Sequence, residues 1–332
     1  MNWIHHAAEA EFALRAVTAA AEVCRGVQQG ARHAPQRKPD ASPVTEADYA
    51  SQALIGGWLD EAFPHDPLVA EEDSLTLAGE AGLAERVLAR LKPLRPEADA
   101  DSLRRWLDHG ARRSGDRFWT LDPIDGTKGF LRGDQYVVAL ALIEDGRVMV
   151  AAVAAPALAP DLRPAASETG SAVVAVRGQG AWVTPLAGGT QRRLTVSTGS
   201  DPAPARLVAS VEEAHTNAAQ LARICRRLGV GPAPTHLDSQ AKYLVIAAGQ
   251  ADLLIRLPPQ RQPSYKEKVW DVAPGLLVVE EAGGRVTDLD GRPLDLTAGR
   301  ELVRNRGSLI SNGWLHDSAL AAIQAESAGD RE

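Results

Sequence analysis

The sequence predicts a protein of mixed helices and strands, with an α+β domain at residues 1–200 and an α/β domain at residues 201–332. Apolar residues recur at helical spacing across residues 3–30 and 45–63. From residue 118 to 186, apolar runs are broken by turn residues, which is typical of β-hairpins. From about residue 204, strand and helix patterns alternate, as in α/β domains. A chain of 332 residues also favours two domains or one large layered fold.

The N-terminal elements follow from capping and turn signals. The first helix is expected to end at Gly30, and Thr45 opens the second. Residues 83–110 are expected to be helical with a proline-interrupted middle. The hairpin at residues 136–156 turns at Glu144-Asp145-Gly146, and the hairpin at residues 171–186 turns at Gly178 and Gly180.

The C-terminal elements are expected as a strand at residues 206–211, helical patterns at 217–229 and 237–250, and a strand at 251–257. A helix at residues 272–284 ends in glycine, and a hairpin is expected at residues 285–296. A strand at residues 308–311 and a short final helix complete the chain.

Composition excludes several classes of protein. The net charge of −7 disfavours a nucleic-acid or membrane-surface binder, since both need a positive field. Cys24 and Cys225 are the only cysteines, so a disulfide framework is not expected. The first residues read as an amphipathic helix rather than a signal peptide, and apolar runs are too short to span a bilayer. We therefore expect a cytoplasmic protein, either a monomer or a homodimer.

The stretch LDPIDGTKGF, residues 121–130, places two carboxylates at the end of a predicted strand. Pro123 restricts Asp122 to extended geometry, and Asp125-Gly126 turns the chain into a helix that begins at Thr127. Both carboxylates can therefore project from one side of a rigid turn. A β-turn with an Asx cap explains the same residues without any ligand.

Three other acids stand at comparable positions. Glu71 follows a short apolar run, Asp48 completes a capping-box pattern with Thr45, and Asp271 precedes a helix. Each has a purely structural explanation. Together with Asp122 and Asp125 they form a set of oxygen ligands of the kind that Mg²⁺ prefers. The sequence shows neither a His/Cys cluster typical of zinc nor a GxxxxGK[ST] loop.

Seven segments in the same order resemble the inositol monophosphatase superfamily of lithium-sensitive, Mg²⁺-dependent phosphatases. They are SPVTEADYASQ, VAEED, DPIDGTKGFLRG, AVRGQGAW, SVEEAHTN, DSQAKY and YKEKVWDVAPG. Within the superfamily they are most similar to the 3'(2'),5'-bisphosphate nucleotidases. The resemblance implies a layered αβαβα sandwich of the inositol monophosphatase and fructose-1,6-bisphosphatase type. It also implies that the first domain carries most metal ligands and the second carries Asp271 and nucleotide-contacting segments.

The resemblance further implies a role for each acid. Two or three Mg²⁺ ions would be bound by Glu71, Asp122, the carbonyl of Ile124, Asp125 and Asp271. Asp48 and Thr127 would orient and deprotonate the attacking water. The implied substrate is a phosphorylated adenosine nucleotide, contacted by Gly126, Thr127, His215, Ser239, Gln240, Lys242 and Arg256.

The continuation GTKGFLRG distinguishes the chain from inositol monophosphatases, which typically have an Asn-Phe-type sequence there. An inositol phosphate or sugar phosphate phosphatase with the same metal site remains an alternative, as does a non-catalytic nucleotide sensor. His215 is also explained as a solvent-facing loop residue, and the basic run at residues 256–268 as a solvated loop. The sequence departs from the family pattern at Ala70 and Asp73, and leaves the role of the loop at residues 157–170 open.

Overall fold

The structure is a computed structural model that describes residues 3–30, 36–37, 43–79, 82–110, 115–164, 167, 169–212, 217–262 and 264–329. Its helices are α1 (Ala7–Gln29), α2 (Glu46–Ala62), α3 (Ser74–Ala78), α4 (Leu83–Leu91), α5 (Ala100–Leu107), α6 (Thr127–Arg132), α7 (Ala218–Leu228), α8 (Ala241–Ala247), the 3₁₀-helix η2 (Val269–Asp271), α9 (Ala273–Glu281) and α10 (His316–Gly329).

The strands belong to several sheets. The large sheet runs β3 (Leu68–Ala70), β4 (Arg117–Asp125), β5 (Val137–Glu144), β6 (Arg147–Ala155), β7 (Ser171–Val176), β8 (Gly180–Pro185) and β9 (Arg192–Arg193). A smaller sheet has the order β12 (Leu253–Arg256), β14 (Ser308–Ser311) and β13 (Arg285–Thr287). Two-stranded sheets are formed by β1 (Gln36–Arg37) with β2 (Pro43–Val44) and by β10 (Val208–Ala209) with β11 (Thr235–His236). A bridge between Leu207 and Leu253 connects β10 to the smaller sheet.

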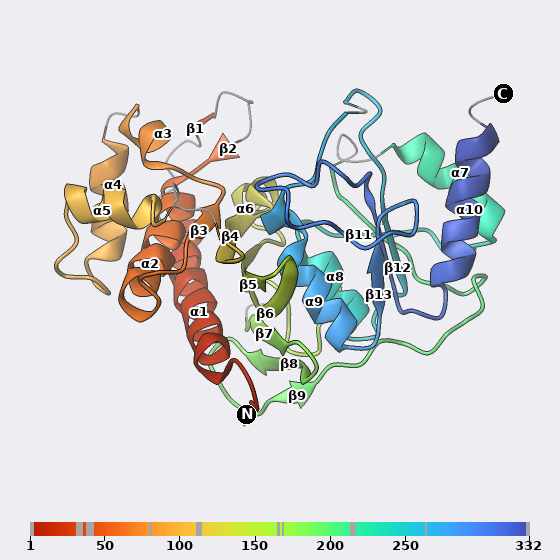
Figure 1. The fold of residues 1–332 in the computed structure, drawn as a ribbon, viewed down its shortest axis with the longest axis horizontal. Coiled ribbons are helices and arrows are strands. Elements are labelled where there is room, and N and C mark those ends of the chain that lie inside the picture. Colours follow the sequence, from red (N-terminus) through yellow and green to blue (C-terminus); the bar gives the residue numbers. More distant parts are fainter. Residues whose placement is uncertain are drawn as a thin grey trace.

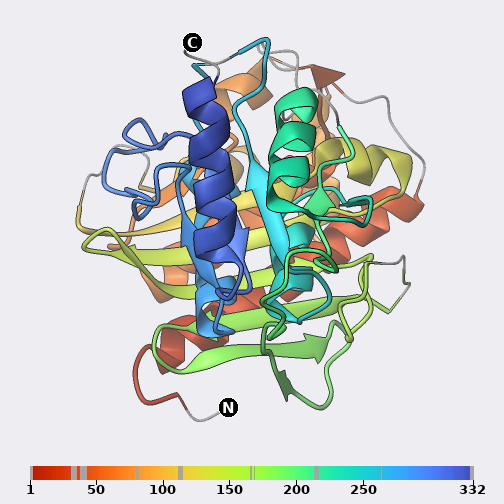
Figure 2. The ribbon, with the colours of Figure 1, turned by 90° about the vertical axis from the view of Figure 1, so that its right-hand side faces the viewer.

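These elements stack in five layers, as Figure 1 shows from left to right. The helices α1 and α2 cover one face of the large sheet, and α8 and α9 lie between its other face and the smaller sheet. The helices α7 and α10 lie side by side over the outer face of the smaller sheet (Figure 2). The predicted αβαβα arrangement is therefore confirmed.

The large sheet is buried on both faces, which explains its continuous apolar strands. In β5, Val138, Leu140 and Leu142 face the cluster that contains α1. The alternate residues Ala139 and Ala141 face the cluster that contains α8 and α9. Residues from both halves of the chain thus share one core, and the predicted division near residue 200 stays a prediction.

Local signals predicted most element boundaries. Gly30 caps α1, and Thr45 caps α2 with the expected capping box to Asp48. Asp145 and Gly146 adopt positive φ of 49° and 72° in the β5–β6 turn. The predicted helical region at residues 83–110 is divided into α4 and α5.

The prediction of a hairpin at residues 285–296 is wrong. Only Arg285–Thr287 forms a strand, and it pairs with β14. The carboxylate of Asp288 accepts hydrogen bonds from the backbone N–H groups of Asp290 and Arg292, at 2.9 and 2.8 Å. This carboxylate closes a tight turn, and Pro293 after it cannot donate to a strand partner.

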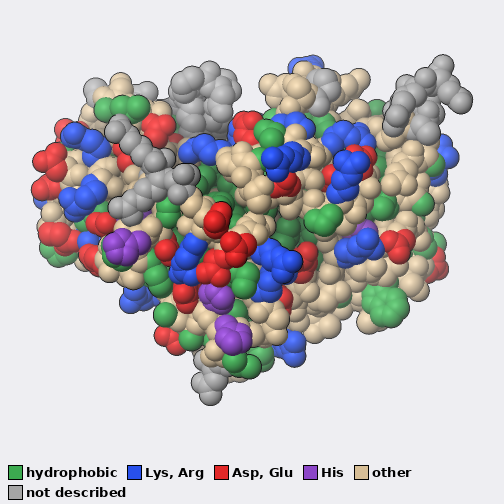
Figure 3. All heavy atoms as spheres, in the orientation of Figure 1, with side chains coloured by type: hydrophobic (Ala, Val, Ile, Leu, Met, Phe, Trp, Pro, Cys, Tyr) green, Lys and Arg blue, Asp and Glu red, His purple; other side chains and the backbone are tan. Residues whose placement is uncertain are grey.

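Among the described residues, no helix is long and apolar enough to cross a membrane. Acidic and basic side chains lie side by side over the face shown in Figure 3. Although the net charge of the chain is −7, this face carries basic side chains among its acidic ones.

Candidate active site

Two acids leave the large sheet side by side at the ends of β3 and β4. The two strands are parallel, with Ala70 paired to Leu121. Glu71 and Asp122 are the next residues along each strand, so they emerge at the same edge of the sheet. Asp122 is buried and Glu71 is half-buried. The predicted convergence of these two segments is thus a consequence of strand pairing.

The turn after β4 is held by its own polar groups. The pairing of β4 with β5 shifts between Asp122 and Asp125, at the proline. The Ile124 N–H donates to Asp122 Oδ1 at 3.1 Å, and Thr127 Oγ1 donates to the Ile124 carbonyl at 3.2 Å. The Asx-type turn is therefore present, and the carbonyl predicted to bind metal is contacted by the predicted catalytic hydroxyl.

Asp48 lies at the N-terminus of α2 and is almost fully buried, with 1% of its surface exposed. Its Oδ2 accepts hydrogen bonds from the Thr45 N–H at 2.8 Å and the Thr45 hydroxyl at 2.7 Å. The helix α6, which begins at Thr127, contacts β2 directly before Thr45. The capping role predicted for Asp48 is confirmed, and it places the carboxylate at the α2 end nearest α6.

Asp271 comes from the second half of the chain, at the end of η2. Burial raises the pKa of its carboxyl to about 7, Arg256 opposes this, and the negative charges of Asp125 and Glu71 add to it. Burial likewise raises the pKa of Asp125, against the positive charges of Lys242 and Arg256. Two like charges raise each other's pKa only when they lie within a few ångströms of one another. Glu71, Asp125 and Asp271 therefore lie near enough for their charges to interact, although they come from both halves of the chain.

The donor set fits a hard divalent cation in its chemistry, because carboxylate and carbonyl oxygens make it up. Within the described residues, however, no three His, Cys, Asp and Glu side chains are grouped so that they could hold a metal ion. Protein donors engage these oxygens instead: Asp125 Oδ2 accepts the Gln240 N–H at 2.6 Å. Because a carboxylate has about four lone-pair sites, an oxygen that accepts one N–H still has lone pairs for a cation.

Two cations lie beside the acids. Lys242 is buried, donates from Nζ to the Leu237 carbonyl at 3.1 Å, and has its pKa lowered to about 8 by burial and by the charge of Arg256. Arg256 pairs through Nε with Glu267 at 2.6 Å. Burial lowers the pKa of the Arg256 guanidinium, but the combined effect of Glu267, Asp271 and two tyrosines outweighs burial and raises the pKa well above its ordinary value. Both cations keep a positive field next to Asp125 and Asp271.

The remaining predicted residues line the same region. Ser239 has a positive φ of 62°, a strained conformation for a non-glycine residue. Gly126 has a φ of 90°, and a Cβ there would approach Ser239 Cβ at 3.0 Å. The turn after β4 therefore packs directly on the segment before α8. His215 lies outside the described residues.

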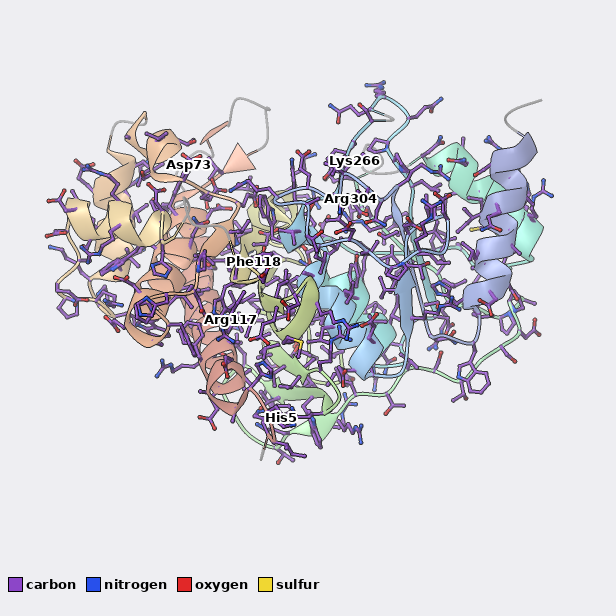
Figure 4. The ribbon with its side chains drawn as sticks, in the orientation of Figure 1. His5, Asp73, Arg117, Phe118, Lys266 and Arg304 are labelled. Carbon is purple, nitrogen blue, oxygen red and sulfur yellow. The ribbon has the colours of Figure 1, made fainter. Side chains whose placement is uncertain are left out.

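Asp73, whose role the sequence left open, and Arg261, for which a solvated loop was predicted, both lie in local environments that explain them. Asp73 caps α3, where its carboxylate accepts the Thr76 N–H at 2.7 Å. In the view of Figure 4, Asp73 lies on one side of α6 and Lys266 on the other. Arg261 is exposed, in agreement with a solvated loop.

Sequence reasoning missed an ion-pair network on α6. Arg132 contacts Glu212 at 2.7 Å and also pairs with Asp238, while Lys128 contacts Glu212 at 3.1 Å. The two acids belong to the SVEEAHTN and DSQAKY segments, so α6 connects the turn after β4 to both. The only signal in the sequence was the presence of Lys128 and Arg132 in GTKGFLRG. No local pattern identifies their partners, because these lie far along the chain.

Sequence reasoning also missed an arginine that bridges the two halves. Arg300 donates to the Ala70 carbonyl at 2.8 Å, and its guanidinium lies 4.5 Å from the Trp270 ring centroid. These two residues directly precede Glu71 and Asp271.

Comparison with known proteins agrees with this geometry. The profile of the Inositol monophosphatase family matches residues 5–328. The chain therefore belongs to the inositol monophosphatase family. This is a family of metal-dependent phosphatases, and the assignment accounts for the acids gathered at the ends of β3 and β4.

Several curated relatives in this family are similar over most of their length. The 3'(2'),5'-bisphosphate nucleotidase of Oryza sativa is 39% identical over 342 residues, covering 96% of this chain and 94% of the relative. The 3'(2'),5'-bisphosphate nucleotidase 1 of Candida albicans is 37% identical over 326 residues, covering 90% and 88%.

Solved structures share the fold at lower identity. The IMPase of Thermotoga maritima has a TM-score of 0.68 at 20% identity, covering 97% of this chain and 99% of that chain. CysQ from Bacteroides thetaiotaomicron, titled a bacterial member of the family, has a TM-score of 0.64 at 20% identity, covering 94% and 99%.

Proposed function

We propose that this protein is a Mg²⁺-dependent phosphatase that hydrolyses the 3'-phosphate of 3'-phosphoadenosine 5'-phosphate to give AMP, and that it also accepts the sulfated nucleotide. The observation that carries the proposal is the contact of Asp125 with the segment that carries Lys242, where the charges of Lys242 and Arg256 act on the Asp125 carboxyl. A ligand with two phosphates matches such a site, because one phosphate suits the acidic end with its metal and the other suits the cations.

Glu71, Asp122, the Ile124 carbonyl, Asp125 and Asp271 would hold two or three Mg²⁺ ions. Bound there, Mg²⁺ would neutralise charge on the phosphoryl group and acidify a water molecule. The five ligands come from the ends of β3, β4 and η2. The strand pairing at Ala70 and Leu121 keeps the first two together.

Asp48 and Thr127 would prepare the attacking water. A carboxylate next to a threonine hydroxyl can take up the proton that the water loses on attack. The new P–O bond forms as the bond between phosphorus and the ribose 3'-oxygen breaks, and the 3'-oxygen leaves with a proton. The products are AMP and inorganic phosphate.

Ser239, Lys242 and Arg256 would bind the second phosphate, and His215 would contact the adenine. A guanidinium has five N–H donors, so the Nε contact of Arg256 with Glu267 is compatible with a phosphate at its other edge. The nucleotide substrate is further supported by the relatives from Oryza sativa and Candida albicans, which are named as 3'(2'),5'-bisphosphate nucleotidases.

A substrate panel tests the proposal. Phosphate release is measured from 3'-phosphoadenosine 5'-phosphate, inositol 1-phosphate and fructose 1,6-bisphosphate, with Mg²⁺, with EDTA and with added Li⁺. We expect the nucleotide to have the highest kcat/KM, with inhibition by EDTA and Li⁺. A preference for inositol 1-phosphate would replace the proposed substrate, and nucleotide binding without turnover would indicate a sensor.

A further inference from the structure

Three neutral, fully buried side chains contact the backbone of the acidic segments: Ser51 and Gln52 on α2, and Gln240 before α8. We propose that they are positioning residues, which hold the metal-binding acids in place through the neighbouring peptide groups. The inference rests on the proposed metal site.

Gln52 holds the segment after β3. Its Nε2 donates to the Glu72 carbonyl at 2.7 Å, and its Oε1 accepts the Glu72 N–H at 3.0 Å. The same Nε2 donates to the Leu107 carbonyl at 3.0 Å, which connects this segment to α5. The Gln52 side-chain amide thus pairs with both the backbone N–H and the backbone carbonyl of Glu72, as a neighbouring strand would. Glu71 is directly bonded to the residue that Gln52 holds.

Ser51, the neighbour of Gln52 on α2, holds the turn after β4. Its hydroxyl donates to the Pro123 carbonyl at 3.0 Å. Pro123 lies between Asp122 and Ile124, which are both predicted ligands. The helix that carries Asp48 therefore also fixes the backbone of two other ligand segments.

Gln240 connects the turn after β4 with the segment that carries Asp271. Its backbone N–H donates to Asp125 Oδ2 at 2.6 Å. Its side-chain Nε2 donates to the Trp270 carbonyl at 3.0 Å, and its Oε1 accepts the Gly275 N–H at 2.9 Å. The sequence comparison assigned Gln240 to a nucleotide-contacting segment, but its amide is engaged by the protein at both ends.

The neutrality of these side chains suits their position. A lysine or arginine in their place would pair with the carboxylates and compete with a divalent cation for them. Another carboxylate would add a negative charge next to the acids and increase the repulsion among them. An amide or a hydroxyl fixes a backbone without changing the charge of the site. Removing such outer partners of a metal site typically costs about 10–100-fold in metal affinity or activity.

The test compares Gln52→Met and Gln240→Met with Asn312→Leu. Each substitution replaces a buried amide by an apolar side chain of similar size. Asn312 is a matched control, because its amide also bridges backbone groups, at Gly199 and Leu315, without contacting an acidic segment. Metal binding is measured with Mn²⁺ alone, by the loss of the free-ion electron paramagnetic resonance signal, and Mg²⁺ activation is measured by phosphate release.

We expect Gln52→Met and Gln240→Met to weaken Mn²⁺ binding and raise the half-activating Mg²⁺ concentration by about 10-fold or more. The Asn312→Leu variant should bind Mn²⁺ like the wild type even if its melting temperature falls. Ser51→Ala, a smaller change, provides the same test if a glutamine variant does not fold. Wild-type Mn²⁺ affinity in folded variants would overturn the inference, whereas a wild-type protein that neither binds Mn²⁺ nor releases phosphate would overturn the proposed function itself.

Discussion

The substitution Gly129→Ala tests whether catalysis depends on the close packing of α6 against the segment before α8. Gly129 is buried in α6, and an added Cβ would lie 2.2 Å from the Gln135 carbonyl oxygen and 2.7 Å from Asp238 Oδ2. Gly129→Ala should therefore push α6 away from both. The nearer contact is with backbone, which cannot swing aside as a side chain can.

The size of the effect follows from that distance. The 2.2 Å contact is shorter by about 1 Å or more than an ordinary van der Waals separation. Overpacking of this kind costs about 1–3 kcal/mol of unfolding free energy. A shift of about 1 Å at the turn that carries Thr127 can cost about 100-fold in rate. We expect Gly129→Ala to lower kcat/KM for the nucleotide by about that factor.

The assay is Mg²⁺-dependent phosphate release, together with urea unfolding. Gly26→Ala is the matched control, because Gly26 also lies inside a helix and an added Cβ would meet nothing within 4 Å. That variant should keep its activity and gain about 0.4–1 kcal/mol of stability. Wild-type kcat/KM in Gly129→Ala would show that the placement of α6 against Asp238 does not matter for catalysis.

Three further predictions follow from single side chains. Asp122→Asn should lower turnover by more than about 100-fold with the fold intact on circular dichroism, because the amide oxygen can still accept the Ile124 N–H but carries no charge for a cation; near-normal turnover would refute its role as a ligand. Arg256→Ala should raise KM chiefly for the bisphosphate, whereas exposed Arg261→Ala should not; equal losses on a monophosphate would indicate that Arg256 supports the fold instead. Burial lowers the pKa of His316 from 6.5 to about 4. As the pH falls from 6.5 to about 4, the imidazole is therefore protonated in the unfolded chain but stays neutral in the folded chain, and this difference lowers the free energy of unfolding. Between pH 7 and 5 the wild type should therefore lose about 2 kcal/mol more unfolding free energy than His316→Asn in urea titrations, and equal losses would contradict this.

Features that depend on neighbouring residues were predictable from the sequence. The capping box of Thr45 and Asp48 needs two residues three positions apart, and the β5–β6 turn needs only Asp145-Gly146. The Asp-Gly at residues 290–291 has the same composition but forms no hairpin. The difference arises from tertiary pairing, since β13 finds its partner in β14.

Features that depend on distant partners could not be predicted in this way. Gln240 and Asp125 are separated by 115 residues, and Gln52 and Leu107 by 55. A buried glutamine has no periodicity or spacing that names its partner. The resemblance to a phosphatase family suggested which acids would bind a cation, since each acid alone also has a structural explanation. Neither the resemblance nor the sequence pattern suggested which neutral side chains hold the backbone beside them.

The central claim is that acids from β3, β4 and η2 share divalent cations. Anomalous scattering from Mn²⁺ in a crystal of this protein tests it most directly, because the ion positions are seen without reference to any substrate. We expect anomalous density surrounded by the carboxylates of Glu71, Asp122, Asp125 and Asp271. Ordered Mn²⁺ found only elsewhere on the protein would contradict the account.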